Sequence, residues 1–247
     1  MTAASSPSLL SQKSIPRRER LIFPLDVDSY DEALELVEQL GDSVLFYKLG
    51  LQLFMSRRYF ELADLLRARG KQVFVDLKFF DVPETVGSAV RMLAQTRATF
   101  ATVHGNDAML EAAVREKKDT RILAVTVLTS LDVSDLRDLG FPVPSVEALV
   151  LSRARRALKL GCDGVISSGV EAPALRRELG DSLLIVSPGI RPLENRLADD
   201  QKRVVTVEDA FRNGADYIVV GRPIRKAKDP RAAAEAVQAT IATLFSA

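Results

Sequence analysis

A single (β/α)₈ TIM barrel with a short disordered N-terminal extension is the fold that the sequence predicts. Strand-like and helix-like segments alternate eight times, and each strand-like run is short and apolar. Such strands pair in parallel when helices return the chain between them. Eight units in about 225 residues is the number expected of a closed barrel. An open, doubly wound sheet is the alternative, but no G-x-G-x-x-G motif follows the first strand, where a Rossmann domain would place it.

The expected strands are runs rich in apolar and β-branched residues. In chain order they are Leu21–Val27, Val44–Leu49, Gln72–Leu77, Phe100–His104, Arg121–Leu128, Gly164–Ser168, Leu183–Ser187 and Asp216–Gly221.

The segments between these strands carry apolar residues at helical spacing. Ala33, Leu36, Val37 and Leu40 follow the i, i+3, i+4, i+7 pattern of a helix with one buried face. The same pattern recurs at Leu62, Leu65 and Leu66 before the stop at Gly70, at Val86, Val90 and Leu93, and at Leu149, Ala154 and Leu158.

The chain divides into a tail, residues 1–20, and one barrel domain, residues 21–247. The first 14 residues are rich in serine, lack acidic residues and show no apolar periodicity. Leu9-Leu10 is too short for the apolar core of a secretory signal, although the following arginines leave a transit peptide as an alternative to a disordered tail. We therefore expect removal of residues 1–18 to leave fold and activity unchanged.

Composition excludes several classes of function. Lys and Arg total 34 and Asp and Glu total 33, for a net charge of +1, so a broad nucleic-acid or membrane-surface role is not expected. No run approaches the roughly 18 apolar residues of a transmembrane helix. A single cysteine, Cys162, excludes a disulfide framework and a multi-cysteine zinc site, and is assigned to packing. These features predict a cytoplasmic protein.

Charged residues gather where the predicted strands end, which is where barrel enzymes carry their chemistry. Asp26, Lys48, Asp76 and Lys78 lie in or just after the first three strands. Taken singly, each is explained by a solvated strand end. Together they would be costly to bury unless they pair. Asp76 and Lys78 are two residues apart on one strand and therefore point to the same face.

Other candidates lie in the following loops. Asp81 precedes Val82-Pro83, so it occupies a loop or a helix cap. His104 ends the fourth strand, where a satisfied hydrogen-bonding histidine is the simplest interpretation. Thr129 and Ser130 follow the fifth strand.

The segment Asp76–Val86, DLKFFDVPETV, closely resembles the D-x-K-x-x-D-[IV]-P-x-T signature of orotidine 5′-phosphate decarboxylases. The resemblance runs from about Leu21 to the C-terminus and is to the bacterial branch. Phe80 and Glu84 depart from the usual His and Asn. Further segments match in order: Pro24–Asp26, Tyr47–Gly50, Ala124–Ser130, Ser187–Pro192, Asp200–Arg203 and Val220–Ile224.

The resemblance implies an enzyme that decarboxylates orotidine 5′-phosphate without a metal or cofactor, as the last step of de novo pyrimidine nucleotide synthesis. Lys48, Asp76, Lys78 and Asp81 would form an alternating array, in which Lys78 protonates C6. The implied substrate-binding residues are Asp26, Lys48, Asp76, Thr85, Thr129, Ser130, Pro188, Arg191, Gln201, Gly221 and Arg222. The family pattern also implies a homodimer in which Asp81 and Thr85 reach the partner's site.

Two alternatives have other sequence marks. The D-x-K-x-x-D motif is shared with hexulose-phosphate synthases, so a Mg²⁺-dependent lyase or aldolase acting on a sugar phosphate is the nearest rival. The Pro-x-Thr extension and the segments around Thr129, Gln201 and Arg222 favour the decarboxylase. A non-catalytic phosphate-ligand sensor would be expected to lack Lys78 or one of the aspartates, and none is missing.

Overall fold

Eight parallel strands close into a barrel in the computed structural model, which describes residues 9–191 and 204–246. The strand order is β1 to β8 in sequence, and β8 pairs with β1 to close the ring. This confirms the predicted (β/α)₈ fold and all eight strand positions. The strands are β1 (Leu21–Pro24), β2 (Phe46–Gly50), β3 (Gln72–Phe79), β4 (Phe100–Val103), β5 (Arg121–Val125), β6 (Gly164–Ile166), β7 (Leu184–Ser187) and β8 (Tyr217–Val219).

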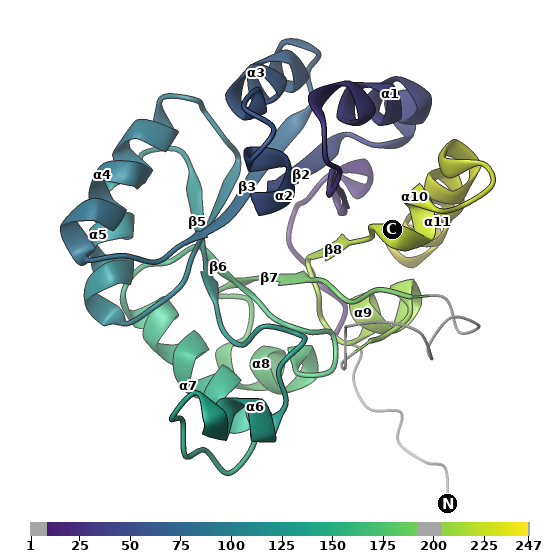
Figure 1. Ribbon diagram of the computed structural model, residues 1–247. Helices are drawn as coiled ribbons and strands as arrows, with labels where there is room; N and C mark the ends of the chain where they lie inside the picture. The colour runs from purple at the N-terminus through teal and green to yellow at the C-terminus, as the bar shows by residue number, and fades with distance from the viewer. Residues whose placement is uncertain (1–8, 192–203, 247) are drawn as a thin grey trace, which may run out of the picture.

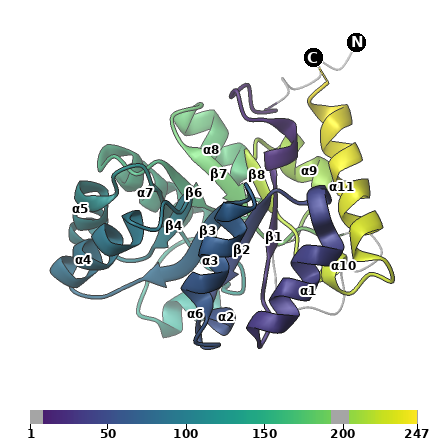
Figure 2. The same cartoon turned by 90° about the horizontal axis from the view of Figure 1, so that it is seen from above.

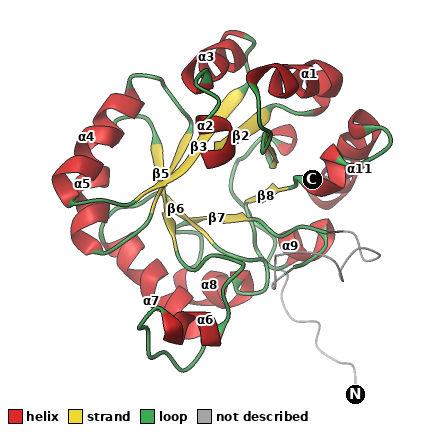
Figure 3. Cartoon of the chain, in the orientation of Figure 1, coloured by secondary structure: helices red, strands yellow, loops and turns green. Residues whose placement is uncertain are grey.

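Helices form the outer layer around the strands, as Figures 1 and 3 show. The last helix packs against the first, and Figure 2 shows the two side by side. The α-helices are α1 (Tyr30–Leu40), α2 (Leu51–Phe54), α3 (Tyr59–Ala68), α4 (Pro83–Ala94), α5 (Asp107–Glu116), α6 (Val133–Asp138), α7 (Val146–Lys159), α8 (Ala172–Leu179), α9 (Val207–Arg212), α10 (Arg222–Arg225) and α11 (Pro230–Leu244). Two 3₁₀ turns, η1 (Arg17–Glu19) and η2 (Gly41–Ser43), complete the described elements.

The predicted helix faces are the buried ones. Ala33, Val37 and Leu40 of α1 are buried against the barrel, as are Val86 and Val90 of α4. Ser29 caps α1 by accepting the backbone N–H of Glu32. The outer core therefore lies between the strands and these helix faces.

A second, smaller core fills the barrel itself. Ile22, Phe46 and Phe74 point inward from the first three strands, and Phe46 packs against Phe100 with ring centroids 5.0 Å apart. Side chains alternate along a strand, so the next inward positions toward the C-terminal end are two residues further on. Those positions are Pro24, Lys48 and Asp76. The strand pattern thus places two charges directly above an aromatic layer.

The expectation of a disordered tail through residue 20 does not hold for residues 9–20, which pack against the N-terminal end of the barrel. Ser11 is 4% exposed and donates a hydrogen bond to Asp216, and Lys13 Nζ lies 3.1 Å from Asp216 Oδ2. Ile15 packs against the inner core, and Arg20 lies over the ring of Phe245. The physical reason is Asp216: this fully buried carboxylate requires cations and donors, and the segment supplies them alongside Arg176. Residues 1–8 lie outside the described part.

No helix within residues 9–191 and 204–246 combines the length and apolarity needed to cross a membrane. Cys162 is buried, in agreement with its predicted packing role, and burial raises the pKa of its thiol to about 12.

Candidate active site

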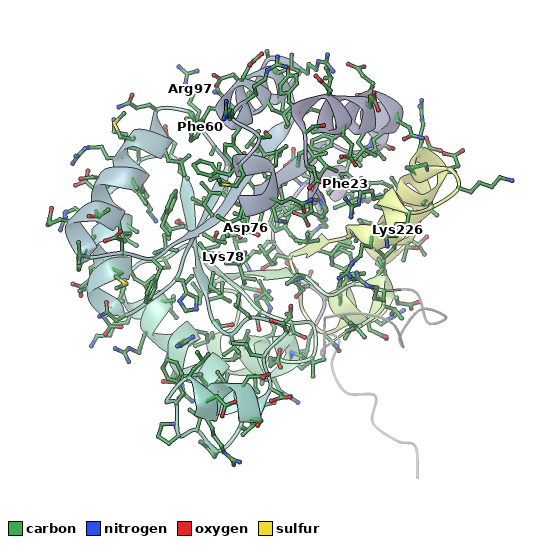
Figure 4. All side chains as sticks on the ribbon, viewed as in Figure 1. Phe23, Phe60, Asp76, Lys78, Arg97 and Lys226 are labelled. Atoms are coloured by element: carbon green, nitrogen blue, oxygen red, sulfur yellow. The ribbon has the colours of Figure 1, made fainter. Side chains whose placement is uncertain are left out.

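A cavity of about 280 Å³ opens at the C-terminal end of the strands. It brings together residues from loops that are far apart in sequence, and Figure 4 shows Asp76 and Lys78 near the centre of the helix ring. Most of the predicted site residues line it: Asp26, Lys48, Asp76, Lys78, Thr129, Ser130, Pro188, Arg191, Gly221 and Arg222.

Four of these side chains form a continuous chain of alternating charge. Lys48 Nζ lies 3.1 Å from Asp26 Oδ1 and 3.2 Å from Asp76 Oδ2. Lys78 Nζ lies 2.8 Å from Asp76 Oδ1. Side-chain exposure is 47% for Asp26 and 32% for Lys78 but only 12% for Lys48 and 11% for Asp76, so the two middle members are buried and the two end members are open to the cavity. The i, i+2 prediction for Asp76 and Lys78 is confirmed by this contact.

The surroundings keep both buried members of this chain ionised. Burial by itself raises the pKa of Asp76, but the charges of Lys48 and Lys78 and hydrogen bonds from Lys78 and Thr102 outweigh it and lower that pKa to about 2. Burial lowers the pKa of Lys48, but the carboxylates of Asp76 and Asp26 reverse this, and the net shift is upward. At neutral pH Asp76 is therefore an anion and Lys48 a cation.

Thr102 is a site residue that the sequence analysis missed. It is fully buried on β4, donates to Asp76 Oδ1 at 2.9 Å, and accepts the backbone N–H of Lys78 at 3.0 Å. The backbone of Lys78 has φ of +49°, and the pairing of β3 with β4 shifts register between Val75 and Phe79. A non-glycine residue is strained in this conformation, so Thr102 helps to hold Lys78 where it is. In the sequence, Thr102 could have been noticed as the one hydroxyl-bearing residue inside the apolar run Phe100–Val103.

Gly50 leaves room for the ion pair. A Cβ atom there would lie 3.2 Å from both Asp26 Oδ1 and Lys48 Nζ. Glycine at the end of β2 therefore permits the close approach of these two charged groups.

The side of the cavity that follows β7 and β8 is basic and glycine-rich. Gly189 has φ of +79°, and a Cβ on Gly221 would lie 2.8 Å from Pro24 Cγ. Arg191, Arg222 and Arg225 line the same cavity. Exposed backbone N–H groups and guanidinium groups are the donors that bind a phosphate. Arg225 was not predicted from the sequence; it lies one helical turn after Arg222.

Thr129 and Ser130 line the side of the cavity that follows β5. Buried apolar residues, Val125 and Val127, lie next to them. Hydroxyl groups beside an apolar wall suit the edge of a planar heterocycle, since they supply hydrogen bonds while the wall contacts the ring face.

Two predicted residues, Asp81 and Thr85, are not brought into this cavity. Asp81 and Thr85 are exposed, at the start of α4 and outside the lining. The Asp81 carboxylate accepts the backbone N–H of Val82, and Val82 rather than Asp81 is the N-cap of α4. Gln201 lies outside the described residues.

His104 and Phe80 lie beside the site rather than in it. Their rings are 5.6 Å apart, and both line a neighbouring cavity whose walls include residues of α5 and α7. Burial lowers the pKa of His104, and the charges of Arg153 and Lys78 lower it further. This agrees with leaving His104 out of the predicted chemistry.

No three His, Cys, Asp or Glu side chains converge on a possible metal position in the described part of the chain.

Comparison with known proteins shows which family the chain resembles. The family model described as "Orotidine 5'-phosphate decarboxylase / HUMPS family" matches residues 19–237. A protein from Methylococcus capsulatus named orotidine 5′-phosphate decarboxylase is 65% identical over 98% of this chain and 99% of its own length. A protein of the same name from Stenotrophomonas maltophilia is 50% identical over 96% of this chain and 100% of its own length. The crystal structure of orotidine 5′-phosphate decarboxylase from Lactobacillus acidophilus superposes with a TM-score of 0.79 at 34% identity, covering 90% of this chain and 99% of that one.

Proposed function

The chain belongs to the orotidine 5′-phosphate decarboxylase / HUMPS family, and we propose that it converts orotidine 5′-phosphate to uridine 5′-phosphate without a cofactor. This is the last step of de novo pyrimidine nucleotide synthesis. The observation that carries the proposal is the chain of alternating charge from Asp26 to Lys78, which ends in a cavity with a basic, glycine-rich far end.

The reaction requires a cation next to C6 of the pyrimidine ring. When the bond between C6 and the carboxylate breaks, carbon dioxide leaves and the electron pair stays on C6, in the plane of the ring. The π system does not delocalise that pair. The Lys78 ammonium, placed beside C6, stabilises the pair and then transfers a proton to it, which gives the C6–H bond of the product. Solvent returns a proton to Lys78.

Electrostatics supplies a useful share of the barrier reduction. A unit-charge interaction at about 4 Å in an effective dielectric near 20 is worth roughly 4 kcal/mol. Because each 1.36 kcal/mol is tenfold in rate, this interaction corresponds to about three decades. Asp76 holds the ammonium in place before the reaction begins, and Lys48 pairs with the other oxygen of Asp76, so little reorganisation is needed at the transition state.

The rest of the substrate extends along the cavity. Asp26 and Lys48 meet the ribose hydroxyl groups, and Thr129 and Ser130 meet the polar edge of the pyrimidine. Gly221 and Arg222 bind the phosphate, together with the segment from Pro188 to Arg191 and with Gln201. Binding energy from this remote phosphate orders the reacting end.

The enzyme works as a homodimer in which Asp81 and Thr85 complete the partner's site. Two features support this. Asp81 and Thr85 are exposed and lie outside the cavity of their own chain. Apolar side chains around them are unusually exposed: Phe80 is 65%, Val82 61% and Met92 59% exposed. A surface of this kind is typical of an interface. The partner is a second copy of the chain, and the working location is the cytoplasm.

One assay tests the function. Purified protein is mixed with orotidine 5′-phosphate in the presence of EDTA, and loss of the orotate absorbance band is followed. We expect full turnover in the chelator. Activity that EDTA abolishes would favour the Mg²⁺-dependent sugar-phosphate lyase or aldolase instead. Tight nucleotide binding without any turnover would favour a sensor.

A further inference from the structure

Arg225 lines the reaction cavity but has no role in the mechanism above. It lies at the end of α10, three residues after Arg222, so both side chains leave the same face of this single turn. Its backbone N–H donates to the carbonyl oxygen of Gly221 at 3.0 Å. Arg225 is therefore fixed to the turn that presents Gly221 and Arg222.

The Arg225 guanidinium reaches across to the first strand. It donates a hydrogen bond to the backbone carbonyl of Asp26, in the loop between β1 and α1. The Asp26 carboxylate in turn lies 3.1 Å from Lys48 Nζ. Strand β1 ends at Pro24, and the Leu25 N–H still donates a hydrogen bond to the Lys48 carbonyl of β2 at 2.9 Å. Asp26 therefore lies just beyond the strand pairing. The loop that orients Asp26 is thus held from the α10 side by Arg225.

Arg225 is available for this task because no acidic side chain in the described part of the chain competes for it. Within residues 9–191 and 204–246, it forms no ion pair. Its bond to a neutral carbonyl is charge-assisted, and such bonds are stronger than those between neutral partners. The guanidinium also adds a third positive charge to the end of the cavity that already holds Arg191 and Arg222.

We propose that Arg225 is a positioning residue that couples the phosphate end of the cavity to the Asp26 end, by fixing the Asp26 backbone from the turn that carries Gly221 and Arg222. The proposal rests on the proposed function, because the ribose role of Asp26 and the phosphate role of Arg222 belong to it. Order at the phosphate end is transmitted through one short turn and one hydrogen bond to Asp26, and from there to Lys48 and Asp76.

The test compares three single variants with the wild-type enzyme. Arg225→Met keeps a long side chain but removes the donors and the charge. Arg222→Met removes a group that binds the phosphate directly. Lys226→Met is the matched control, because it removes one positive charge from the next residue. Lys226 is exposed and outside the cavity lining. Figure 4 labels Lys226. Affinities for uridine 5′-phosphate and for uridine are measured by NMR titration, and turnover of orotidine 5′-phosphate by absorbance.

A positioning role predicts a particular pattern. Arg225→Met lowers the affinities for uridine 5′-phosphate and for uridine by similar factors of about five to thirty, because the ribose contact is disturbed whether or not phosphate is present. It also lowers kcat. Arg222→Met lowers the affinity for uridine 5′-phosphate by more than tenfold but leaves the affinity for uridine within about twofold of wild type. Lys226→Met stays within twofold in every measurement. If Arg225→Met lowers the affinity for uridine 5′-phosphate but not for uridine, Arg225 contacts the phosphate directly and the proposal is wrong.

A double-mutant cycle with Asp26→Asn gives the second readout. If Arg225 acts through Asp26, Arg225→Met should cost less than about twofold once Asp26 is already replaced. Effects that multiply would overturn the proposal. Arg225→Lys, which retains a charged donor, should recover part of the lost kcat, and melting temperatures within a few degrees of wild type show that each variant folds. A wild-type protein without decarboxylase activity would refute the proposed function, and the two binding titrations would still test the contact between Arg225 and Asp26.

Discussion

The hydroxyl group of Thr102 donates to Asp76 Oδ1 at 2.9 Å from the neighbouring strand. The Thr102 hydroxyl oxygen also accepts the backbone N–H of Lys78, whose φ is +49°. One buried side chain thus contacts both the carboxylate that holds the proposed proton donor and the strained backbone of that donor. Strain at such a position persists because the surrounding contacts fix it.

Thr102→Val should damage catalysis more than binding. The substitution keeps the side-chain shape and removes both hydrogen bonds. It leaves the partly buried Lys78 N–H without its acceptor, at a cost of about 1–3 kcal/mol in the free energy of unfolding. We expect kcat to fall by at least tenfold while the affinity for uridine 5′-phosphate changes less than threefold. Thr102→Ser, which restores the hydroxyl, is the control. A valine variant with wild-type kcat would show that Thr102 serves stability alone.

Lys78→Ala should abolish decarboxylation and leave binding of uridine 5′-phosphate largely intact. Lys78 is the more exposed of the two lysines that line the cavity, whereas Lys48 is held between two carboxylates. Turnover is followed at the orotate band and binding by titration with the product. If the variant retains activity within tenfold of wild type, another group donates the proton.

The ion pairs of Asp76 should make stability depend on acid pH. The pKa of Asp76 is about 2 in the folded chain, against an ordinary value of 3.8. Because the folded pKa is the lower one, the stabilisation is complete above about pH 4 and disappears as pH falls through 2; it amounts to about 2 kcal/mol. Urea unfolding of wild type and Asp76→Asn should therefore give a stability difference that narrows below pH 4. The exposed Asp138→Asn serves as control, and a gap that stays constant down to pH 2.5 would contradict the assignment.

The barrel was predictable from sequence because its strands carry short apolar runs and its helices carry one-sided apolar patterns. The charged chain was partly predictable, since Lys48, Asp76 and Lys78 interrupt those runs at strand ends. Thr102 and Arg225 escaped prediction for a common reason. Each acts through hydrogen bonds to residues at least 24 positions away, and the sequence pattern does not contain such pairings.

The N-terminal segment was mispredicted for the same reason. Residues 9–20 lack periodicity, so nothing local indicates that they pack. Their partner is Asp216, which precedes β8 and is fully buried. A short polar segment becomes ordered when it satisfies a distant buried charge, and the pairing of Lys13 with Asp216 spans 203 positions.

A chain that begins at residue 19 should be less stable but fully active. It loses the Ser11 and Lys13 contacts with Asp216 and uncovers the inner core that Ile15 packs against. A loss of about 2–4 kcal/mol corresponds to a melting temperature lower by roughly 5–15 °C. Because these contacts lie at the end of the barrel opposite the cavity, kcat/KM at 25 °C should remain within twofold. Lys13→Met should reproduce part of the shift, and the exposed Lys228→Met none of it. An unchanged melting temperature would restore the original expectation of a dispensable tail.

Asp81 and Thr85 should act in the site of the partner chain, which a mixed dimer tests. Lys78→Ala and Asp81→Ala chains are each expected to be nearly inactive alone. In a mixed dimer one site lacks both residues, while the other combines Lys78 from one chain with Asp81 from its partner. Random exchange makes half of the dimers mixed, each with one intact site of two, so about a quarter of wild-type activity should return under two-fold symmetry. Subunit exchange is confirmed separately, by mass spectrometry of differently tagged chains. If exchange is complete and no activity returns, Asp81 acts within its own chain and the shared site is refuted.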